Sequence, residues 1–389
     1  MTRKPRKVCV FVTARPSYAR VRSVLEALKA RQDVELQIVA AASALSDSYG
    51  NVANVMATEG FAPDATVDSL VEGEGYLDAP ETTARGLSLS SKVLTQLKPD
   101  LVVTIADRYE TLATAIAATY MNIPLAHLQG GEVTGNIDEK VRHAITKLAD
   151  LHLVSGPDAA QRVERMGESV ESIFTTGCPS IDIARLAVTT AERLPDAELY
   201  ARFGISGAQP DLSGGYIVVM QHPVTTAHAD AGAQTQATLE AVDALGLPAL
   251  WFAPNVDFGA DATNAAIRVY REAHALEHVH FMQNMPPDEF IRLLAGSKGI
   301  VGNSSVAIRE CAFLGVPAVN IGDRQDGRDR GPNVIDTTYD AAEIQAALAA
   351  NVARGKLEGA DNYGDGFSGP RIAQVLAEAP LRFHKRMTY

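Results

Sequence analysis

The chain is poor in cysteine and lacks both a glycine-rich dinucleotide fingerprint and a long apolar run. Its three cysteines lie far apart and form no CxxC pair, which excludes a disulfide framework and the common zinc-site spacings. The first apolar run, residues 8–12, is too short for a signal-peptide core or a membrane span. We therefore expect a cytoplasmic protein that binds neither membranes nor metal ions.

Basic residues are also outnumbered. The 35 Lys and Arg residues face 47 Asp and Glu, which gives a formal net charge of −12. Nucleic-acid-binding proteins need a basic surface, so we exclude nucleic acid as a partner. A small anionic ligand is still compatible with this charge, because helix N-termini and a few arginines make a local positive site.

Short apolar runs alternate with amphipathic segments along most of the chain. Runs such as 8–12, 34–42, 101–105 and 151–154 predict buried strands, and helical apolar spacing, as at 19–29, predicts the helices between them. The alternation predicts an α/β fold with parallel, doubly wound sheets. With 46% hydrophobic residues in 389, the chain can form two cores.

A second alternating series follows a stretch rich in proline and glycine, which we interpret as a link. We predict two Rossmann-like domains that face each other across a cleft, followed by a C-terminal helix: domain 1–190, linker 191–213, domain 214–370 and helix 371–389. Small-molecule sites concentrate at such domain interfaces.

Charged and polar residues gather where two neighbouring predicted strands end. Asp107, Arg108 and Glu110 follow the strand at 101–105. A larger group follows the strand at 123–126: His127, Gln129, Glu132, Asp138, Glu139, Arg142 and His143. Ligands of open α/β sheets bind beyond the carboxyl ends of the strands, so we predict a site here rather than a solvated face.

The first strand leads into a turn that carries Arg15, Pro16 and Arg20. Proline suits the first turn of a helix, and backbone NH groups beside a guanidinium suit a phosphate. The alternative is a capped helix with two solvated arginines.

The second half contains a comparable combination. Residues 302–305 (Gly-Asn-Ser-Ser) lie between a predicted strand and a helix predicted over 306–313, where small hydroxyl residues either cap the helix or bind phosphate. Glu310 in that helix could accept hydrogen bonds from two ribose hydroxyls. The loop 322–331 adds three arginines and three aspartates; the alternative for this loop is an exposed set of ion pairs.

His222 follows another predicted strand and precedes Pro223. A residue before proline is held extended, so we expect the imidazole to point from the strand end into the cleft; a structural histidine is the alternative. His274, His278 and His280 look like a metal cluster, but they span a helix end and a strand without a partnering carboxylate. We therefore predict no metal site.

Together these segments resemble the hydrolysing UDP-N-acetylglucosamine 2-epimerase family, which starts sialic-acid-type sugar biosynthesis. The matching motifs are Asp107-Arg-Tyr-Glu110, Gly130-Gly-Glu-Val-Thr-Gly-x-Ile-Asp138, Arg142-His-Ala-Ile-Thr-Lys-Leu148, Gly177-Cys-Pro-Ser-Ile-Asp182, His222-Pro-Val-Thr225, Pro254-Asn-x-Asp257, Gly302-Asn-Ser-Ser305 and Arg324-Gln-x-Gly-Arg328. The resemblance implies the glycosyltransferase-B fold, with the last helix crossing back onto the first domain.

The resemblance also implies roles for single residues. Asp107 and Asp138 match catalytic acids of the family. Six residues are implied to bind the nucleotide, by contact with the diphosphate or the ribose or by lining the pocket: Ser304, Ser305, Glu310, Asn255, Asn303 and Arg328. His222 and Arg15 approach the phosphates with the help of Arg108, and His127 completes the predicted substrate contacts.

Three positions depart from the family pattern, all on the sugar side. Ser17 replaces an acid, Ala44 replaces a histidine, and Gln129 replaces the acid of a His-x-Glu-Gly-Gly motif. A glutamine amide can act neither as a base nor as an acid. Glu132, three residues further on, is the candidate substitute.

The leading expectation is a hydrolysing 2-epimerase without a cofactor, acting on UDP-N-acetylglucosamine or a close UDP-amino sugar by elimination of UDP and hydration of the glycal. Ser17, Ala44 and Gln129 motivate an alternative, in which the same scaffold makes or breaks another anomeric bond between a phosphosugar or nucleotide sugar and an acceptor such as a nucleobase. A third hypothesis, a sensor without catalysis, conflicts with the retained Asp107 and Asp138. The resemblance implies a homodimer or homotetramer.

Overall fold

The computed structural model describes residues 4–72, 77–133, 137–224, 230–253, 260–382, 385–386 and 388. The chain divides into two compact units. The first unit comprises Met1–Glu132, Asn136–Asp182 and Tyr363–Tyr389, and the second comprises Val133–Gly135 and Ile183–Asn362. Each unit is built on one sheet of its own.

The sheet of the first unit has the described strand order β3-β2-β1-β4-β5-β6-β7. All of its strand pairs are parallel. The strands are β1 (Arg6–Val12), β2 (Val34–Ala41), β3 (Ala65–Val67), β4 (Leu101–Ile105), β5 (Leu125–Leu128), β6 (Leu151–Val154) and β7 (Ile173–Thr175). The apolar runs of the sequence thus form the central strands, which are buried on both faces as parallel sheets require.

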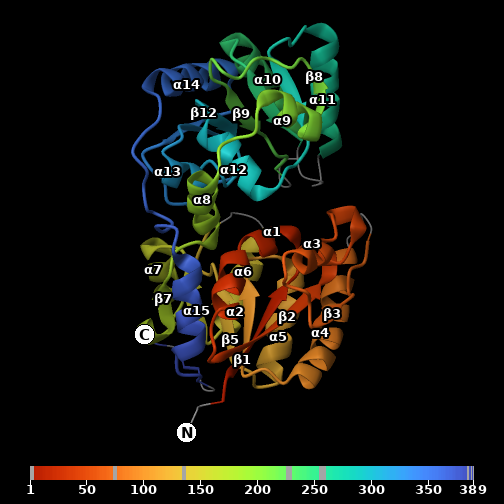
Figure 1. Cartoon of the computed structure of the whole chain (residues 1–389), viewed down its shortest axis with the longest axis vertical. Coiled ribbons are helices and arrows are strands. Elements are labelled where there is room, and N and C mark those ends of the chain that lie inside the picture. The colour runs from red at the N-terminus through yellow and green to blue at the C-terminus, as the bar shows by residue number, and fades with distance from the viewer. Residues whose placement is uncertain are drawn as a thin grey trace. The chain divides into compact units, whose positions relative to one another are not determined.

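Helices cover both faces of this first sheet. Alternate residues of β1 point to opposite faces: Val8 and Val10 join a core with helices α2, α3 and α15, whereas Cys9 and Phe11 join a core with α4, α5 and α6. Figure 1 shows the blue helix α15 beside the red helix α2. The helices of this unit are α1 (Arg15–Ala19), α2 (Arg22–Lys29), α3 (Val52–Thr58), α4 (Asp78–Leu97), α5 (Tyr109–Tyr120), α6 (Ile137–Leu148), α7 (Pro157–Arg165) and α15 (Ser368–Glu378), with short 3₁₀ turns η1 (Ala42–Ala44), η2 (Asp47–Tyr49) and η3 (Val170–Ser172).

The sheet of the second unit has the described order β14-β13-β12-β9-β10-β11-β8. Its pairs are parallel except for β8, which runs antiparallel to β11. The strands are β8 (Gly204–Gly207), β9 (Ile217–Met220), β10 (Ala249–Phe252), β11 (Val279–Met282), β12 (Gly299–Gly302), β13 (Ala318–Ile321) and β14 (Val334–Thr337).

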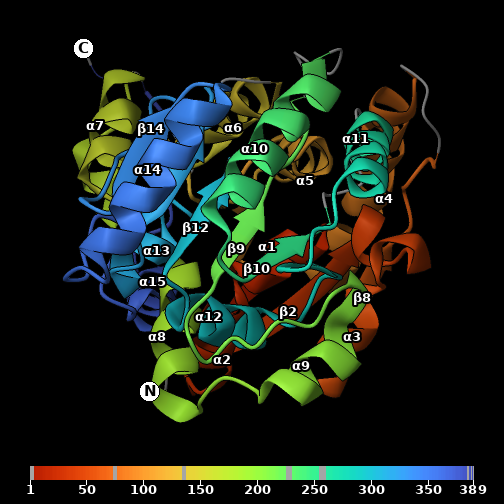
Figure 2. The ribbon, with the colours of Figure 1, turned by 90° about the horizontal axis from the view of Figure 1, so that it is seen from above.

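Two cores again lie on the two faces of the second sheet. One contains side chains of α10, α11 and α14, and the other contains side chains of α8, α9, α12 and α13. Figure 2 shows α10 and α14 side by side over this sheet. The helices are α8 (Pro179–Thr190), in which the boundary between the units falls, α9 (Asp196–Phe203), α10 (Ala231–Leu245), α11 (Ala260–Ala273), α12 (Pro287–Ala295), α13 (Glu310–Leu314) and α14 (Ala341–Arg354). None of the described helices is long and apolar enough to cross a lipid bilayer.

The motif that ends in Asp182 fixes the return of the chain to the first unit. The Asp182 carboxylate accepts hydrogen bonds from the backbone NH groups of Ser368 (2.8 Å) and Gly369 (2.6 Å), so it caps the N-terminus of α15. The NH of Cys178 donates to Tyr363 O at 2.7 Å. This motif therefore has a structural role, and α15 packs on the first unit as the resemblance implies.

Three sequence expectations differ from the structure. The segment 191–213, expected as a linker, contains α9 and β8 and belongs to the second unit, because β8 pairs with β11. The helix expected over 306–313 is shorter: hydrogen-bonded turns occupy 305–309 before α13. The expected boundaries at 190 and 371 fall at 182 and 363 instead.

Candidate functional site

The predicted site residues follow the strands at which the order of each sheet reverses. In the first sheet β1 and β4 are neighbours, and in the second β9 and β12 are neighbours. A doubly wound sheet forms its ligand crevice at this switch point, beyond the carboxyl ends of the strands. Arg15 and Asp107 follow the first pair of strands, and His222 and Asn303 follow the second.

Asp107 is paired with a buried arginine. The Arg142 side chain, 2% exposed, reaches from α6 and donates from Nη2 to Asp107 Oδ2. A second guanidinium, Arg20 Nη1, lies 3.9 Å from Asp107 Oδ1. Adjacent cations favour the ionised carboxylate, so Asp107 is suited to accept a proton. The sequence placed Arg142 in the polar group but gave it no role. Its spacing of one helical turn from Asp138 could have indicated that both side chains lie on the same face of a helix.

The backbone is strained at the carboxyl ends of β4 and β5 in the first sheet. Ala106, directly after β4, and Gln129, directly after β5, have φ values of +59° and +63°. Left-handed backbone is costly for residues other than glycine and clusters at functional sites. The strain therefore supports the predicted location of the site.

Another ion pair after β4 joins Arg108 to Glu110. The guanidinium donates to the carboxylate at 2.9–3.2 Å, and the Glu110 side chain is only 2% exposed. Ser43 Oγ also donates to Glu110 Oε1, at 3.4 Å. Arg108 thus keeps part of its surface open while a fixed carboxylate orients it.

His127 has a different position from the one predicted. Its side chain has no exposed surface, and its nitrogens contact Ala106 O (Nε2, 2.8 Å) and Thr146 Oγ1 (Nδ1, 3.1 Å). Burial lowers the pKa of His127 to about 3, against a smaller opposing effect of the Ala106 carbonyl. Both ring nitrogens are engaged within the protein, which favours a structural role for this neutral histidine.

Gln129 also turns toward protein atoms. Its Nε2 donates to Cys178 Sγ at 3.0 Å, and Cys178 Sγ lies 3.0 Å from Ser180 Oγ. The Gln129 side chain is buried, and its Oε1 has no hydrogen-bond partner within the described part of the chain. At the position where the resemblance implies an acid, the neutral amide of Gln129 thus makes a buried contact with Cys178.

The other predicted residues of the first unit differ in exposure. Glu132 and Ser17 are buried, Asp138 is half-buried in the first turn of α6, and Arg15 is exposed. Ala44 has no exposed surface and packs in the core of the first unit. The three departures from the family pattern are therefore all buried, where side-chain size matters.

In the second unit, Asn303 joins the ends of β9 and β12. Its Oδ1 accepts from the NH of His222 and its Nδ2 donates to His222 O, both at 2.8 Å. The Asn303 carbonyl accepts from Arg324 Nη1 at 3.0 Å and from Gln325 Nε2 at 2.8 Å. Gly302 permits the close approach, since a Cβ there would lie 2.1 Å from Met220 O.

His222 lies at this junction as a neutral ring. Burial lowers its pKa to about 3, with a further contribution from nearby Arg324. A neutral imidazole can donate a hydrogen bond to a phosphate without adding charge. The positive charge near this strand end comes from Arg324 rather than from His222.

Ser304 and Glu310 have the burial expected of ligand-binding groups. Ser304 is 6% exposed and Glu310 7% exposed. Glu310 Oε2 is buried without a hydrogen-bond partner in the described structure. Ser305 Oγ accepts from Arg309 Nη2 at 3.0 Å. Because buried acceptors are normally satisfied, the free oxygen of Glu310 fits a donor supplied by a ligand.

The arginine-rich loop 322–331 is divided between two roles. Arg330 forms ion pairs with Asp336 at 3.1 Å and Asp326 at 3.7 Å, as the ion-pair alternative predicts. Arg324 instead turns toward Asn303, and Arg328 is half-buried in the same loop. The predicted residue Asn255 lies outside the described residues.

The histidines that resemble a metal cluster have a carboxylate neighbour after all. His274 and His278 lie 3.8 Å and 3.6 Å from Asp243, whereas His280 Nδ1 contacts Ala208 O at 2.5 Å. Within the described ranges, no group of three or more His, Cys, Asp or Glu side chains is arranged to hold a metal ion.

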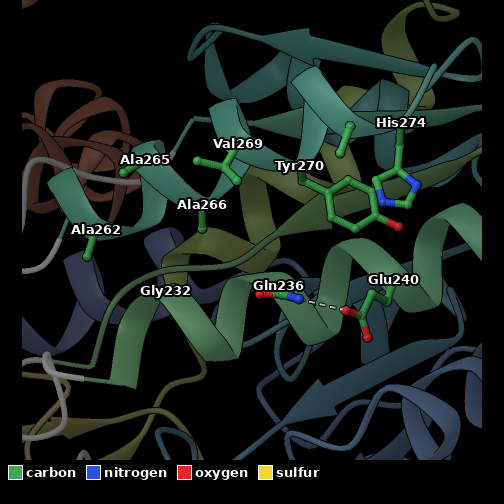
Figure 3. Close-up of a pocket in the computed structure, with 10 residues that line it drawn as sticks. Gly232, Gln236, Glu240, Ala262, Ala265, Ala266, Val269, Tyr270 and His274 are labelled. Carbon is green, nitrogen blue, oxygen red and sulfur yellow. Dashed lines mark hydrogen bonds between the residues drawn. The ribbon is translucent and has the colours of Figure 1, made fainter.

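A cavity of about 680 Å³ lies between α10 and α11, away from these residues (Figure 3). Small residues of α10 and α11, among them Ala265 and Ala266, form part of its wall, and the stacked rings of Tyr270 and His274 lie at one end, 4.1 Å between centroids. Its polar groups already have partners: Gln236 donates to Glu240 at 2.9 Å and Tyr270 to Asp243 at 3.0 Å. The predicted site residues do not line this cavity.

Comparison with known proteins gives a consistent result. The family profile described as UDP-N-acetylglucosamine 2-epimerase matches residues 26–377. The UDP-N,N'-diacetylbacillosamine 2-epimerase (hydrolyzing) of Legionella pneumophila is 33% identical over 381 residues, 97% of each chain. The UDP-N-acetylglucosamine 2-epimerase of Neisseria meningitidis is 28% identical over 95% of this chain and 94% of that one.

Solved structures share the fold. The UDP-GlcNAc 2-epimerase from Neisseria meningitidis bound to UDP-GlcNAc has a TM-score of 0.79 at 16% identity, covering 95% of this chain and 99% of that one. A putative UDP-N-acetylglucosamine 2-epimerase from Listeria monocytogenes has a TM-score of 0.75 at 20% identity, covering 96% of each chain. These likenesses confirm the predicted glycosyltransferase-B class. The chain belongs to the UDP-N-acetylglucosamine 2-epimerase family.

Proposed function

We propose that the protein is a hydrolysing 2-epimerase of UDP-N-acetylglucosamine or a close UDP-amino sugar. A base removes the C2 proton, the C1–O bond breaks, and UDP leaves with the bonding electrons. Water then adds across the C1=C2 bond of the glycal, with a hydroxyl at C1 and a proton returned to the opposite face of C2. The products are UDP and the free 2-epimeric sugar.

The observation that carries this proposal is the position of Asp107 at the switch point of the first sheet, where the buried Arg142 holds its carboxyl group. A positioned carboxylate of this kind is suited to general base catalysis. Asp138, in the first turn of the same helix as Arg142, is the second acid–base group. Glu132 is the remaining buried acid of this segment.

The second unit supplies the groups for the nucleotide. Ser304 and Ser305 meet the diphosphate and Glu310 meets the ribose, while Arg324 and Arg328 neutralise the charge that develops on departing UDP. The unpartnered Oε2 of Glu310 supports the ribose contact.

The names of two relatives support hydrolysis. The Legionella pneumophila relative is named as hydrolyzing, and so is the GDP/UDP-N,N'-diacetylbacillosamine 2-epimerase of Campylobacter jejuni, 28% identical over 85% of this chain and 84% of that one. Both names specify a diacetylated sugar. The departures at Ser17, Ala44 and Gln129 fit a sugar that differs from UDP-N-acetylglucosamine.

Proton and phosphorus NMR in deuterated water tests the proposal. The protein is incubated with UDP-N-acetylglucosamine and, separately, with UDP-N,N'-diacetylbacillosamine. Release of UDP with deuterium at C2 of a free sugar is expected for at least one of them. Epimerised product that keeps its UDP would instead show a non-hydrolysing enzyme, and both substrates unchanged in the presence of bound UDP would refute the proposal.

The buried contact between Gln129 and Cys178 favours a second candidate, an enzyme that makes or breaks another anomeric bond. If that is the activity, Gln129→Glu gains epimerase activity that the natural chain lacks. If the natural chain already hydrolyses a UDP-amino sugar, this candidate is excluded.

A further inference from the structure

An ionic cluster with a buried carboxylate and two partly exposed lysines lies at the C-terminal end of α6 and has no part in the proposed chemistry. It centres on Glu168, whose side chain is 3% exposed. Glu168 Oε1 accepts from Lys147 Nζ, and Oε2 accepts from Lys385 Nζ at 2.7 Å and contacts His152 Nε2 at 3.1 Å. We call these four residues the Glu168 cluster.

The charge state of the cluster follows from its contacts. Burial acts to raise the pKa of Glu168, but hydrogen bonds from His152, Lys147 and Lys385 outweigh burial and lower that pKa to about 2. For His152, a base, burial has the opposite effect and lowers the pKa. The cluster therefore holds the carboxylate of Glu168 between the amino groups of Lys147 and Lys385.

Lys385 comes from the C-terminal segment of the chain and also caps α6. Its Nζ donates to the carbonyls of Thr146 (3.2 Å), Lys147 (2.7 Å) and Ala149 (2.6 Å). The last carbonyls of a helix lack partners within the helix, and a cation there also complements the helix dipole. Thr388 ties the same segment down, because its NH donates to Gly167 O at 3.1 Å.

The first turn of α6 carries Asp138, and the middle of the helix carries Arg142. Arg142, one turn before the capped carbonyls, holds Asp107. Thr146 links the capped turn to Arg142 and His127: its Oγ1 donates to Arg142 O at 3.0 Å and lies 3.1 Å from His127 Nδ1. A displacement of α6 along its axis would thus move Arg142, Asp138 and the His127 contact together.

We propose that Lys385, anchored by Glu168, is a positioning residue for the Asp107–Arg142 pair. The ammonium group touches no substrate; it fixes the axial position of α6 through the carbonyls at its end. The catalytic consequence of this inference rests on the proposed function, whereas its structural part does not.

The test compares three variants of the full chain. Lys385→Met keeps most of the apolar stem and removes the charge, and Lys385→Arg restores a cation. Arg386→Met is the matched control, because Arg386 is exposed in the same segment and makes no hydrogen bond or ion pair among the described residues. The readouts are kcat, KM, UDP affinity, and amide hydrogen exchange over residues 137–148.

Lys385→Met is expected to lower kcat roughly tenfold, since a misplacement of about 1 Å at a catalytic group can cost about 10²-fold and we expect a smaller displacement here. KM and UDP affinity are expected to stay at their natural values, and exchange in the first turns of α6 is expected to rise. Lys385→Arg recovers most of kcat, and Arg386→Met behaves as the natural chain. Should Lys385→Met not fold, Lys385→Gln, which still donates to carbonyls, is expected to give an intermediate kcat and exchange rate.

Unchanged exchange over 137–148 in Lys385→Met would overturn the inference, and so would an equal effect of Arg386→Met. If the natural chain turns over no UDP-amino sugar, the proposed function fails by itself. The exchange comparison then still decides whether Lys385 fixes α6.

Discussion

The two units reverse their strand order in the same way but place different groups at the reversal. In the first unit the charges there are already paired: Asp107 with Arg142 and Glu110 with Arg108. In the second unit Asn303 locks two strand ends together, and Glu310 keeps a buried oxygen without a protein partner. An adjacent cation favours the ionised form of a carboxylate. A buried oxygen without a protein partner is instead available to a hydrogen-bond donor of a ligand. We infer that the same topology serves proton transfer in one unit and nucleotide binding in the other.

The backbone shows the same contrast. The first unit places Ala106 and Gln129 in left-handed conformations at its strand ends, whereas the second unit uses Gly302, which takes a positive φ without the penalty of a Cβ. Strain that only tertiary packing can hold is expected where catalytic groups must be precise. A glycine at the second switch point lets the backbone approach closely at no such cost.

The largest effect is expected for Asp107→Asn, which removes the proposed base but keeps the size of the side chain. We expect kcat to fall about 10²- to 10⁴-fold, the usual contribution of a general base. UDP release followed by phosphorus NMR measures it. Activity within threefold of the natural chain would assign the proton transfer to another residue.

Arg142→Met is expected to affect stability as well as activity. Breaking a buried ion pair leaves the carboxylate of Asp107 with only the more distant Arg20 as a cationic neighbour, at a cost of about 3 kcal/mol in the free energy of unfolding. Arg85→Met is the control, because Arg85 pairs with Glu81 at the surface, where both side chains are more than half exposed, and is expected to cost less than about 0.5 kcal/mol. Urea unfolding compares them, and equal midpoints would contradict the structural importance of the buried pair.

Glu310→Gln is expected to change nucleotide binding and leave proton transfer intact. Loss of one charged acceptor for the ribose should weaken UDP affinity about tenfold, which corresponds to about 1.4 kcal/mol of binding free energy. Pyrophosphate, which has no ribose, should bind to the variant as it does to the natural chain. Calorimetry with both ligands measures the difference, and parallel losses would place Glu310 elsewhere.

A further effect concerns the dependence of stability on pH. The pKa of His127 is about 3 in the folded protein, and a histidine in an unfolded chain titrates near about 6.5. As pH falls below that value, only the unfolded chain takes up the proton, so this neutral histidine lowers the free energy of unfolding by about 1.4 kcal/mol per pH unit. His127→Gln should flatten the slope between pH 6 and 4 by about that amount. An unchanged slope in His127→Gln would show that the ring is protonated in the folded state.

Buried parallel strands could be predicted from the sequence, and the predicted runs 101–105 and 151–154 match the observed bounds of β4 and β6. β4, β6, β10, β11 and β12 are continuous apolar runs because both of their faces are covered. The edge strands β8 and β14 could not be predicted, because both are partly exposed and lack a continuous apolar run. Their pairing depends on tertiary contacts that local periodicity does not encode.

The candidate site was predictable to the level of strand ends but not of side-chain directions. The position after β4 identified Asp107, because topology alone places it at the crevice. Nothing in the sequence showed that Gln129 turns to Cys178 or that His127 points inward to Ala106 O and Thr146. The roles of Arg142 and Lys385 depend on contacts between residues distant in sequence, which only the folded chain displays.

The division of labour between the two units is tested most directly by titrating UDP into Asp107→Asn and Glu310→Gln beside the natural chain. We predict that Asp107→Asn binds UDP as the natural chain does while its kcat falls about 10²- to 10⁴-fold, and that Glu310→Gln binds UDP about tenfold more weakly. A loss of UDP affinity in Asp107→Asn as large as that in Glu310→Gln would contradict the separation of proton transfer from nucleotide binding.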